Sequence, residues 1–126
     1  MARRRTTGPT ERELAILGVL WDKGPSTVRE VHEALRAGGL TGYTTTLKLM
    51  QIMTDKGLLV RSADRPHVYK PAISEENTQK QVVGDLLDKV FAGSAEKLVM
   101  RALSTKRVSA DELNRIRAML NKMEGE

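Results

Sequence analysis

The chain has 126 residues, of which 40% are hydrophobic and 29% charged, and its net charge is +5. This composition is typical of a soluble globular domain and excludes a disordered chain. Because the chain has no cysteine, disulfides, thiolate metal sites and a cysteine nucleophile are excluded. No apolar run approaches the roughly 20 residues that a membrane span requires, and no apolar stretch follows the basic N-terminus as in a secretory signal. We therefore expect a cytoplasmic protein without membrane insertion.

The excess positive charge lies in the N-terminal part. Residues 1–73 contain 12 Lys and Arg against 7 Asp and Glu, whereas residues 74–126 contain nine of each. This asymmetry favours a half that binds a polyanion and a neutral half with another role, although a basic solvated surface would give the same count. The aromatic content of 3% is too low for a broad base-stacking platform for single strands.

Capping-box spacing, in which Glu follows Ser or Thr after three residues, marks the first helix starts at Thr10 and at Ser26 or Thr27. Apolar residues recur with a helical period after each start. Glycine and proline then supply the stop signals. The predicted helices run from Thr10 to about Lys23, from Ser26 or Thr27 to about Gly38 and from about Thr44 to Lys56.

The period changes after the third helix. Leu58–Arg61 and His67–Lys70 are typical of two short strands, and the residues between them are typical of a charged turn. Three helices followed by a hairpin predict a winged helix-turn-helix. The remainder is predicted to be helical, with starts at Ser74 and Ser109 and a short helix over Ala95–Leu103.

The predicted fold class is therefore mainly α with a small β-hairpin: a winged helix-turn-helix followed by a helical dimerisation domain. We expect a basic arm over residues 1–9, a winged-helix DNA-binding domain over residues 10–73 and a helical dimerisation domain over residues 74–126.

Polar residues at the start of the third predicted helix suit the major groove of duplex DNA, which admits one helix. Threonine hydroxyls can bond to phosphates or base edges, and lysine can neutralise a phosphate or reach a guanine. Arginines on the wing and the arm can meet the DNA backbone or a minor groove. The candidate DNA-binding residues are Tyr43, Thr44, Thr45, Thr46 and Lys48 on the helix, Arg61 and Arg65 on the wing, and Arg3, Arg4 and Arg5 on the arm. Two plainer interpretations stay open: the Thr run as a helix start only, and the arm as a solubilising tail.

The C-terminal helices carry wide apolar stripes with little in this chain to pack against. A second copy is the expected partner, because most soluble oligomers are symmetric dimers. The alternative is a monomer in which these helices fold back onto the N-terminal domain. The candidate dimerisation residues are Val83, Leu86, Leu87, Val90, Leu113, Ile116 and Leu120.

Catalytic and metal-binding patterns are weak. His32 and His67, without cysteine or clustered carboxylates, make a poor metal constellation. No Gly-rich phosphate loop and no triad spacing is present. We therefore predict a protein that is not an enzyme and that holds no metal and no cofactor.

Six short motifs follow one another along the chain at Thr10–Leu14, Leu20–Trp21, Thr27–His32, Gly42–Thr45, Lys56–Leu59 and Ser109–Leu113. As an ordered set, over nearly the whole chain, they resemble the penicillinase-repressor (BlaI/MecI) family. The resemblance implies a dimeric bacterial repressor that binds palindromic operators, often with TACA and TGTA half-sites. In the best-known members of this family, a membrane-bound sensor protease responds to a β-lactam, and the repressor is cleaved in its dimerisation domain.

The chain departs from this family's pattern at several positions. The cleaved Asn-Phe pair would fall near Arg101-Ala102 and is absent, which argues against proteolysis at that bond. Related copper-responsive repressors carry a C-terminal cysteine cluster. Because this chain has no cysteine, the resemblance does not extend to them. Ile52 stands where the third helix usually has Arg, and Arg65-Pro66 replaces the usual Gly-Arg pair of the wing. These changes affect the operator sequence and the inducer more than DNA binding itself.

Two other functions stay open from the sequence. A winged helix can use its surface to bind protein instead of DNA, because fold does not fix function. The second alternative is a regulator that senses a ligand in a pocket between its domains. The low aromatic content argues against a pocket lined by many aromatic side chains. A steep fall of duplex affinity with salt would favour DNA binding over both.

Overall fold

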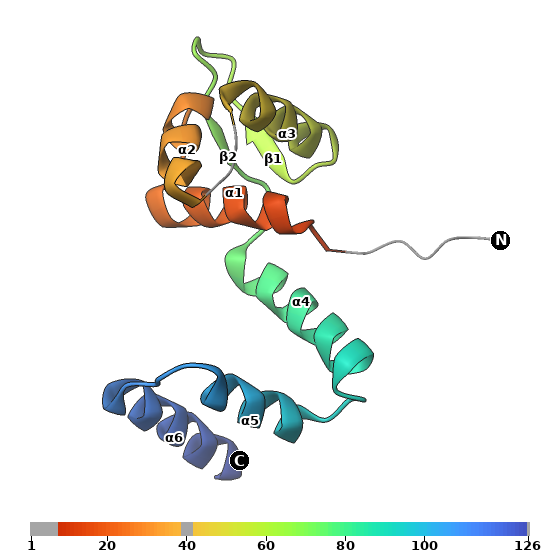
Figure 1. The fold of residues 1–126 in the computed structure, drawn as a ribbon, viewed down its shortest axis with the longest axis vertical. Helices are drawn as coiled ribbons and strands as arrows, with labels where there is room; N and C mark the ends of the chain where they lie inside the picture. The colour runs from red at the N-terminus through yellow and green to blue at the C-terminus, as the bar shows by residue number, and fades with distance from the viewer. Residues whose placement is uncertain (1–7, 39–41, 126) are drawn as a thin grey trace, which may run out of the picture. The chain divides into compact units, whose positions relative to one another are not determined.

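The computed structural model describes residues 8–38 and 42–125. The described chain is mainly helical, with one two-stranded antiparallel sheet, which confirms the predicted fold class of a winged helix followed by helices (Figure 1). The N-terminal elements are α1 (Glu11–Lys23), α2 (Val28–Leu35), a 3-10 turn η1 (Arg36–Gly38), α3 (Tyr43–Asp55), β1 (Leu59–Arg61) and β2 (Tyr69–Pro71). The C-terminal elements are α4 (Glu75–Val90), α5 (Ala95–Thr105) and α6 (Ala110–Glu124).

The first two helices begin at reciprocal capping boxes. The Thr10 hydroxyl accepts the Glu13 N–H at 3.2 Å, and the Glu13 carboxylate accepts the Thr10 N–H at 2.9 Å. Thr27 and Glu30 repeat the arrangement at 3.2 and 2.8 Å. Each box satisfies backbone donors that a helix start leaves without an intrahelical acceptor. The predicted starts are confirmed, and Thr27 is the cap of α2.

The core of the N-terminal part is aliphatic apart from one tyrosine, as the composition requires. Helices α1, α2 and α3 and both strands contribute to it, so no single element could be removed without opening it. The buried hydrophobic residues are Ile16, Leu17, Leu20, Val28, Val31, Met50, Met53, Leu59 and Tyr69.

The strands are shorter than the sequence predicted. Leu58 is excluded from β1 because its N–H donates to the Met53 carbonyl at 2.8 Å and so closes the end of α3. Gly57, with φ of 86°, makes this reversal in the left-handed region that favours glycine. His67 and Val68 are excluded from β2 because they bond to Ser62 across the loop. The pairing of β1 with β2 therefore runs from Leu59–Pro71 to Arg61–Tyr69.

A further bridge holds the hairpin against the loop between α1 and α2. The Ser26 N–H donates to the Tyr69 carbonyl at 3.0 Å, and the Tyr69 N–H donates to the Ser26 carbonyl at 2.8 Å. Ser26 is thus used as a backbone partner of the wing. This bridge fixes the base of the wing relative to the start of α2.

The contacts within the chain divide it into two compact units, residues 1–82 and 83–126, so that the division falls within α4. The start of α4 belongs to the N-terminal unit. Thr78 is buried there, and the Trp21 indole N–H donates to the Ile73 carbonyl at 3.2 Å. The Ser74 hydroxyl accepts the Asn77 N–H at 3.1 Å, in agreement with the predicted helix start.

The C-terminal unit contains the rest of α4 with α5 and α6. Ser94 and Ser109 cap α5 and α6 by accepting the N–H groups of Lys97 and Glu112, each at 3.1 Å. None of residues 83–125 is buried. Over the described part of the chain, no helix is both long enough and apolar enough to cross a membrane.

Candidate nucleic-acid interface

Helix α3 presents the polar face that the sequence predicted, with one exception. Thr44 and Lys48 are exposed, and Thr45 is half-buried. Thr46 is fully buried, and its hydroxyl donates to the Gly42 carbonyl at 3.3 Å. The expectation that Thr46 contacts DNA is therefore corrected: its side chain packs inward on the face of α3 that also carries Met50.

The far end of α3 is fixed to α1 by an ion pair. Lys56 Nζ lies 2.7 Å from Glu13 Oε2, and the Glu13 side chain is only 3% exposed. Burial raises the pKa of Glu13, but hydrogen bonds from Lys56 and from the Thr10 N–H outweigh it and hold the pKa below its ordinary value of 4.5. Glu13 thus caps the start of α1 and also holds the C-terminal end of α3 against α1 through Lys56.

The wing carries its two predicted cations at different places. Arg61 is the last residue of β1, opposite Tyr69, and Arg65 lies in the loop between the strands. Both side chains are exposed. The loop has a defined shape because His67 Nδ1–H donates to the Ser62 carbonyl at 2.9 Å, and the Ser62 hydroxyl accepts the Val68 N–H at 2.9 Å.

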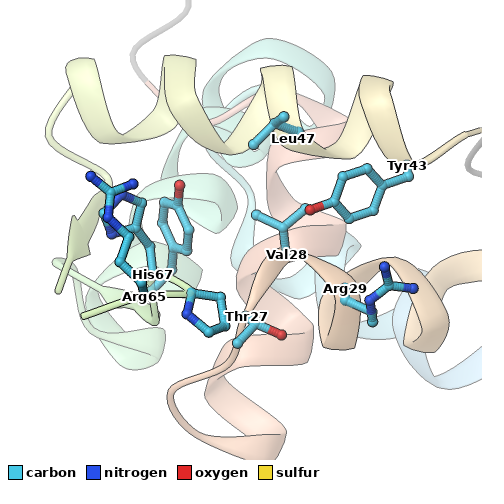
Figure 2. Close-up of a pocket in the computed structure, with 9 residues that line it drawn as sticks. Thr27, Val28, Arg29, Tyr43, Leu47, Arg65 and His67 are labelled. Carbon is cyan, nitrogen blue, oxygen red and sulfur yellow. The ribbon is translucent and has the colours of Figure 1, made fainter. Parts of the chain in front are cut away.

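The first turn of α2, the first turn of α3 and the wing loop meet at one end of the N-terminal unit (Figure 1). Between them lies a groove of about 380 Å³. Its lining residues are Thr27, Val28, Arg29, Tyr43, Leu47, Arg65, Pro66, His67 and Tyr69. The groove brings together two of the predicted DNA-binding residues, Tyr43 and Arg65 (Figure 2).

Arg29 is a candidate that the sequence prediction missed. Its guanidinium carbon lies 5.7 Å from the centre of the Tyr43 ring, within the range of a cation–π contact. His32 meets the same ring edge-on, with the centroids 6.1 Å apart. In the sequence, Arg29 is an ordinary exposed position of a capped helix. The only sequence signal for Arg29 is its position two residues after the Thr27 cap, in the first turn of α2.

The remaining predicted site residues fall into two groups. Arg3, Arg4 and Arg5 lie outside the described residues. Among the predicted dimerisation residues, four are exposed and three are half-buried. The exposed ones are Val83, Leu86, Val90 and Leu120, and the half-buried ones are Leu87, Leu113 and Ile116. Among the residues that the structure describes, no three His, Asp or Glu side chains gather as a metal site would require.

A three-helix unit with a hairpin wing, and with exposed hydroxyl and basic side chains on α3 and the wing, defines the class of winged-helix DNA-binding regulators. Comparison with known proteins narrows the class. The family model described as the penicillinase repressor matches residues 9–122. Proteins named transcriptional regulator BlaI in two strains of Mycobacterium tuberculosis are each 32% identical over 127 residues, covering 98% of this chain and 89% of the relative. The chain belongs to the penicillinase repressor family, as the ordered motifs predicted, and is a DNA-binding transcriptional repressor.

Proposed function

We propose that the chain acts as a homodimer that represses transcription by occupying a palindromic operator in duplex DNA. One observation supports the proposed homodimer: residues 83–125 include no buried side chain, yet they expose large apolar side chains. These are Val83, Leu86, Val90, Val99, Met100, Met119, Leu120 and Met123, each between 41% and 65% exposed.

The exposed apolar residues follow helical spacing, which supports an interface more than scattered surface exposure would. Val83, Leu86 and Val90 stand at i, i+3 and i+7 and share one face of α4. Met119, Leu120 and Met123 gather in the last turns of α6. Contiguous apolar surface of this kind marks an interaction site in soluble proteins. A second copy is the simplest partner, because most soluble oligomers are symmetric.

Two copies would present two α3 helices to the two halves of a palindrome. Helix-turn-helix dimers bind half-sites about one helical turn apart, so protein symmetry and operator symmetry match. We assign Thr44 and Lys48 to the major groove, since both are exposed on α3. Thr45 and Tyr43 flank them at the start of the helix. Arg61 and Arg65 are assigned to the DNA backbone beside the wing.

Relief of repression by a membrane-bound sensor protease stays a prediction from the family resemblance. Arg101-Ala102, near which the resemblance would place the cleaved bond, lies inside α5, and both residues are exposed. The sequence at this position lacks the Asn-Phe pair. We therefore assign no cleavage site to this chain.

The proposal is tested by titrating salt against binding to a TACA/TGTA palindrome and to a scrambled duplex of equal length, with the mass of each complex recorded. A preference of about 10³-fold or more, at two chains per palindrome, is the expected result for a specific dimeric repressor. The logarithm of the affinity should fall linearly with the logarithm of salt, by about 0.9 for each phosphate neutralised.

Other outcomes would change the proposal in defined ways. Equal and weak binding to both duplexes would contradict the proposed operator and leave the winged helix as a general DNA binder. One chain per palindrome at saturation would contradict the dimer. Absence of binding to either duplex would overturn the DNA-binding proposal and favour the protein-interaction module.

A further inference from the structure

The groove between α2, α3 and the wing loop is positively charged on both sides. Arg29 lies on one side with Tyr43, and Arg65 and His67 lie on the other (Figure 2). No Asp or Glu occurs among the described residues that line it. The groove is therefore suited to an anion, and its two arginines come from two segments, α2 and the wing loop, that are distant in the sequence.

The walls between these cations are apolar. Val28, Leu47 and Pro66 contribute to the lining, and the Tyr43 hydroxyl end points from α3 toward Val28 (Figure 2). A nucleic-acid strand has a matching alternation of charged phosphate and carbon-rich sugar. Arginine is the side chain best suited to phosphate, because its planar guanidinium can donate two parallel hydrogen bonds.

The Arg29 side chain has support that an ordinary surface arginine lacks. The centre of the Tyr43 ring lies 5.7 Å from its guanidinium carbon, and His32 meets the same ring in an edge-on arrangement. Tyr43 is also the first residue of α3. The position of Arg29 is thus coupled directly to the start of the helix assigned to the major groove.

We propose that this groove binds one phosphodiester of the operator strand in each half-site, with Arg29 as the principal ligand and the Tyr43 ring as its positioning group. The inference rests on the proposed DNA-binding function and adds a specific residue and site to it. Phosphate contacts fix the register and orientation of a protein on DNA without carrying sequence information. A phosphate held between α2, α3 and the wing would fix how α3 enters the major groove.

The first test compares Arg29→Gln in the full chain with Arg12→Gln. Arg12 is a matched control, since it is an exposed arginine in the first turn of α1 and does not line the groove. Arg29→Gln is expected to weaken binding to the palindrome and to the scrambled duplex by a similar factor. Because one contact is lost in each half-site, the salt slope of the dimer should fall by about 1.8, or about 0.9 for each chain. Arg12→Gln should leave the slope unchanged. An unchanged slope for Arg29→Gln, with wild-type DNA binding intact, would overturn the proposal.

The second test locates the phosphate. Uncharged methylphosphonates are placed one at a time along the palindrome, and the loss of wild-type affinity is mapped. We expect one position in each half-site at which the substitution weakens the wild type but has no further effect on Arg29→Gln. If both proteins respond alike at every position, Arg29 does not hold a phosphate.

The positioning role of Tyr43 has its own readout. Tyr43→Phe keeps the ring against Arg29 and should keep the wild-type salt slope. Tyr43→Ala removes the ring and should lower the slope toward that of Arg29→Gln. If Tyr43→Phe and Tyr43→Ala have the same slope as the wild type, the ring does not position Arg29.

A free anion could use the same chemistry as a DNA phosphate, so a third arm tests inorganic phosphate alone by calorimetry. The proposal predicts no saturable binding, because a single phosphate lacks the flanking sugars and the contacts of α3. Saturable phosphate binding that Arg29→Gln abolishes would assign the groove to a free anion and overturn the DNA-backbone occupant. Failure of the wild type to bind any duplex would instead contradict the proposed function itself.

Discussion

The two units of this chain use the same local signals but differ in what they bury. In the N-terminal unit, two helices that begin at capping boxes pack with α3 and the hairpin around nine buried hydrophobic residues among those that the structure describes. In the C-terminal unit, α5 and α6 also begin at side-chain caps, each with one serine hydrogen bond, yet every described residue is left at least partly exposed. Caps determine where a helix starts, whereas stability depends on burial of its apolar face.

This difference shows which unit is structurally complete. The winged helix has a core of its own, so its α3 and wing can be held at fixed positions. The C-terminal helices need a further surface, and the proposed second copy supplies it. The comparison therefore predicts that substitutions of buried apolar residues in the first unit act on folding, whereas substitutions of exposed apolar residues in the second unit act on association.

The largest expected effect comes from a charge placed on the exposed face of α4. Leu86→Glu would introduce the carboxylate twice in a symmetric interface and should dissociate the dimer. Because joint engagement of two half-sites is lost with it, operator affinity should fall by about 10²–10⁴-fold. Sedimentation measures the dissociation of the dimer, and operator titration measures the loss of affinity.

A matched change on the N-terminal unit, Val60→Glu at an exposed position of β1, should leave the dimer intact. A Leu86→Glu protein that remains dimeric would show that this face of α4 is not the interface.

A core substitution in the N-terminal unit should act in a different way. Leu17 is completely buried, and Leu17→Ala should cost about 2–5 kcal/mol of unfolding free energy, since it removes packed atoms and leaves a cavity. Leu86→Ala, at a side chain that is 42% exposed, is the control. Urea denaturation at several protein concentrations separates them: the Leu86→Ala cost should depend on concentration, and the Leu17→Ala loss should persist at all of them. Equal behaviour of the two variants would contradict the contrast between the units.

Substitution of Lys48 tests whether α3 contacts bases or phosphates. If it contacts a base, Lys48→Ala should weaken operator binding by about 1–3 kcal/mol and relax sequence preference at one position. If it contacts a phosphate, affinity should fall about equally for the palindrome and the scrambled duplex. Unchanged binding to both would remove Lys48 from the interface.

The smallest expected effect concerns the Glu13–Lys56 pair that fixes the end of α3. Since the pKa of Glu13 is lowered on folding, its ionised form stabilises the native state above its ordinary pKa of 4.5. That contribution is lost as the pH falls below this value and through the pKa of the folded state. Because the Lys56 side chain is 48% exposed, we expect no more than about 1 kcal/mol.

The variant Glu13→Gln keeps the size of the side chain and removes its charge. Unfolding free energies of the wild type and Glu13→Gln, measured at about pH 7 and about pH 4, should differ less at the lower pH. Glu11→Gln, an exposed residue in the same helical turn, is the control and should show no such change. An equal difference between Glu13→Gln and the wild type at both pH values would contradict the stabilising role of the ionised carboxylate.

Local sequence predicted the helix starts well because each is a contact between residues three apart. Thr10 with Glu13 and Thr27 with Glu30 are examples, and their hydrogen bonds require no knowledge of the rest of the chain. The run Thr44–Thr46 suggests one polar surface, and this prediction is wrong for Thr46, which is fully buried. Its spacing of four residues from the buried Met50 carried the correct signal.

The groove could not be predicted from the sequence, because its parts come from three segments joined only by tertiary structure. Arg29, Tyr43 and Arg65 meet through the packing of α2 on α3 and through the backbone bridge between Ser26 and Tyr69. The wing itself could be predicted, because the helical spacing of apolar residues ends after the third helix and two short strand-like segments follow. Its loop hydrogen bonds through Ser62, which shorten β2, have no sequence signature of comparable strength.

The most direct test of the dimeric account is sedimentation equilibrium of the full chain without DNA, over a wide range of protein concentration. The exposed apolar residues of α4 and α6 predict a species of twice the chain mass that dissociates on dilution. A single-chain mass at every concentration would contradict the dimer and require another partner for the C-terminal unit.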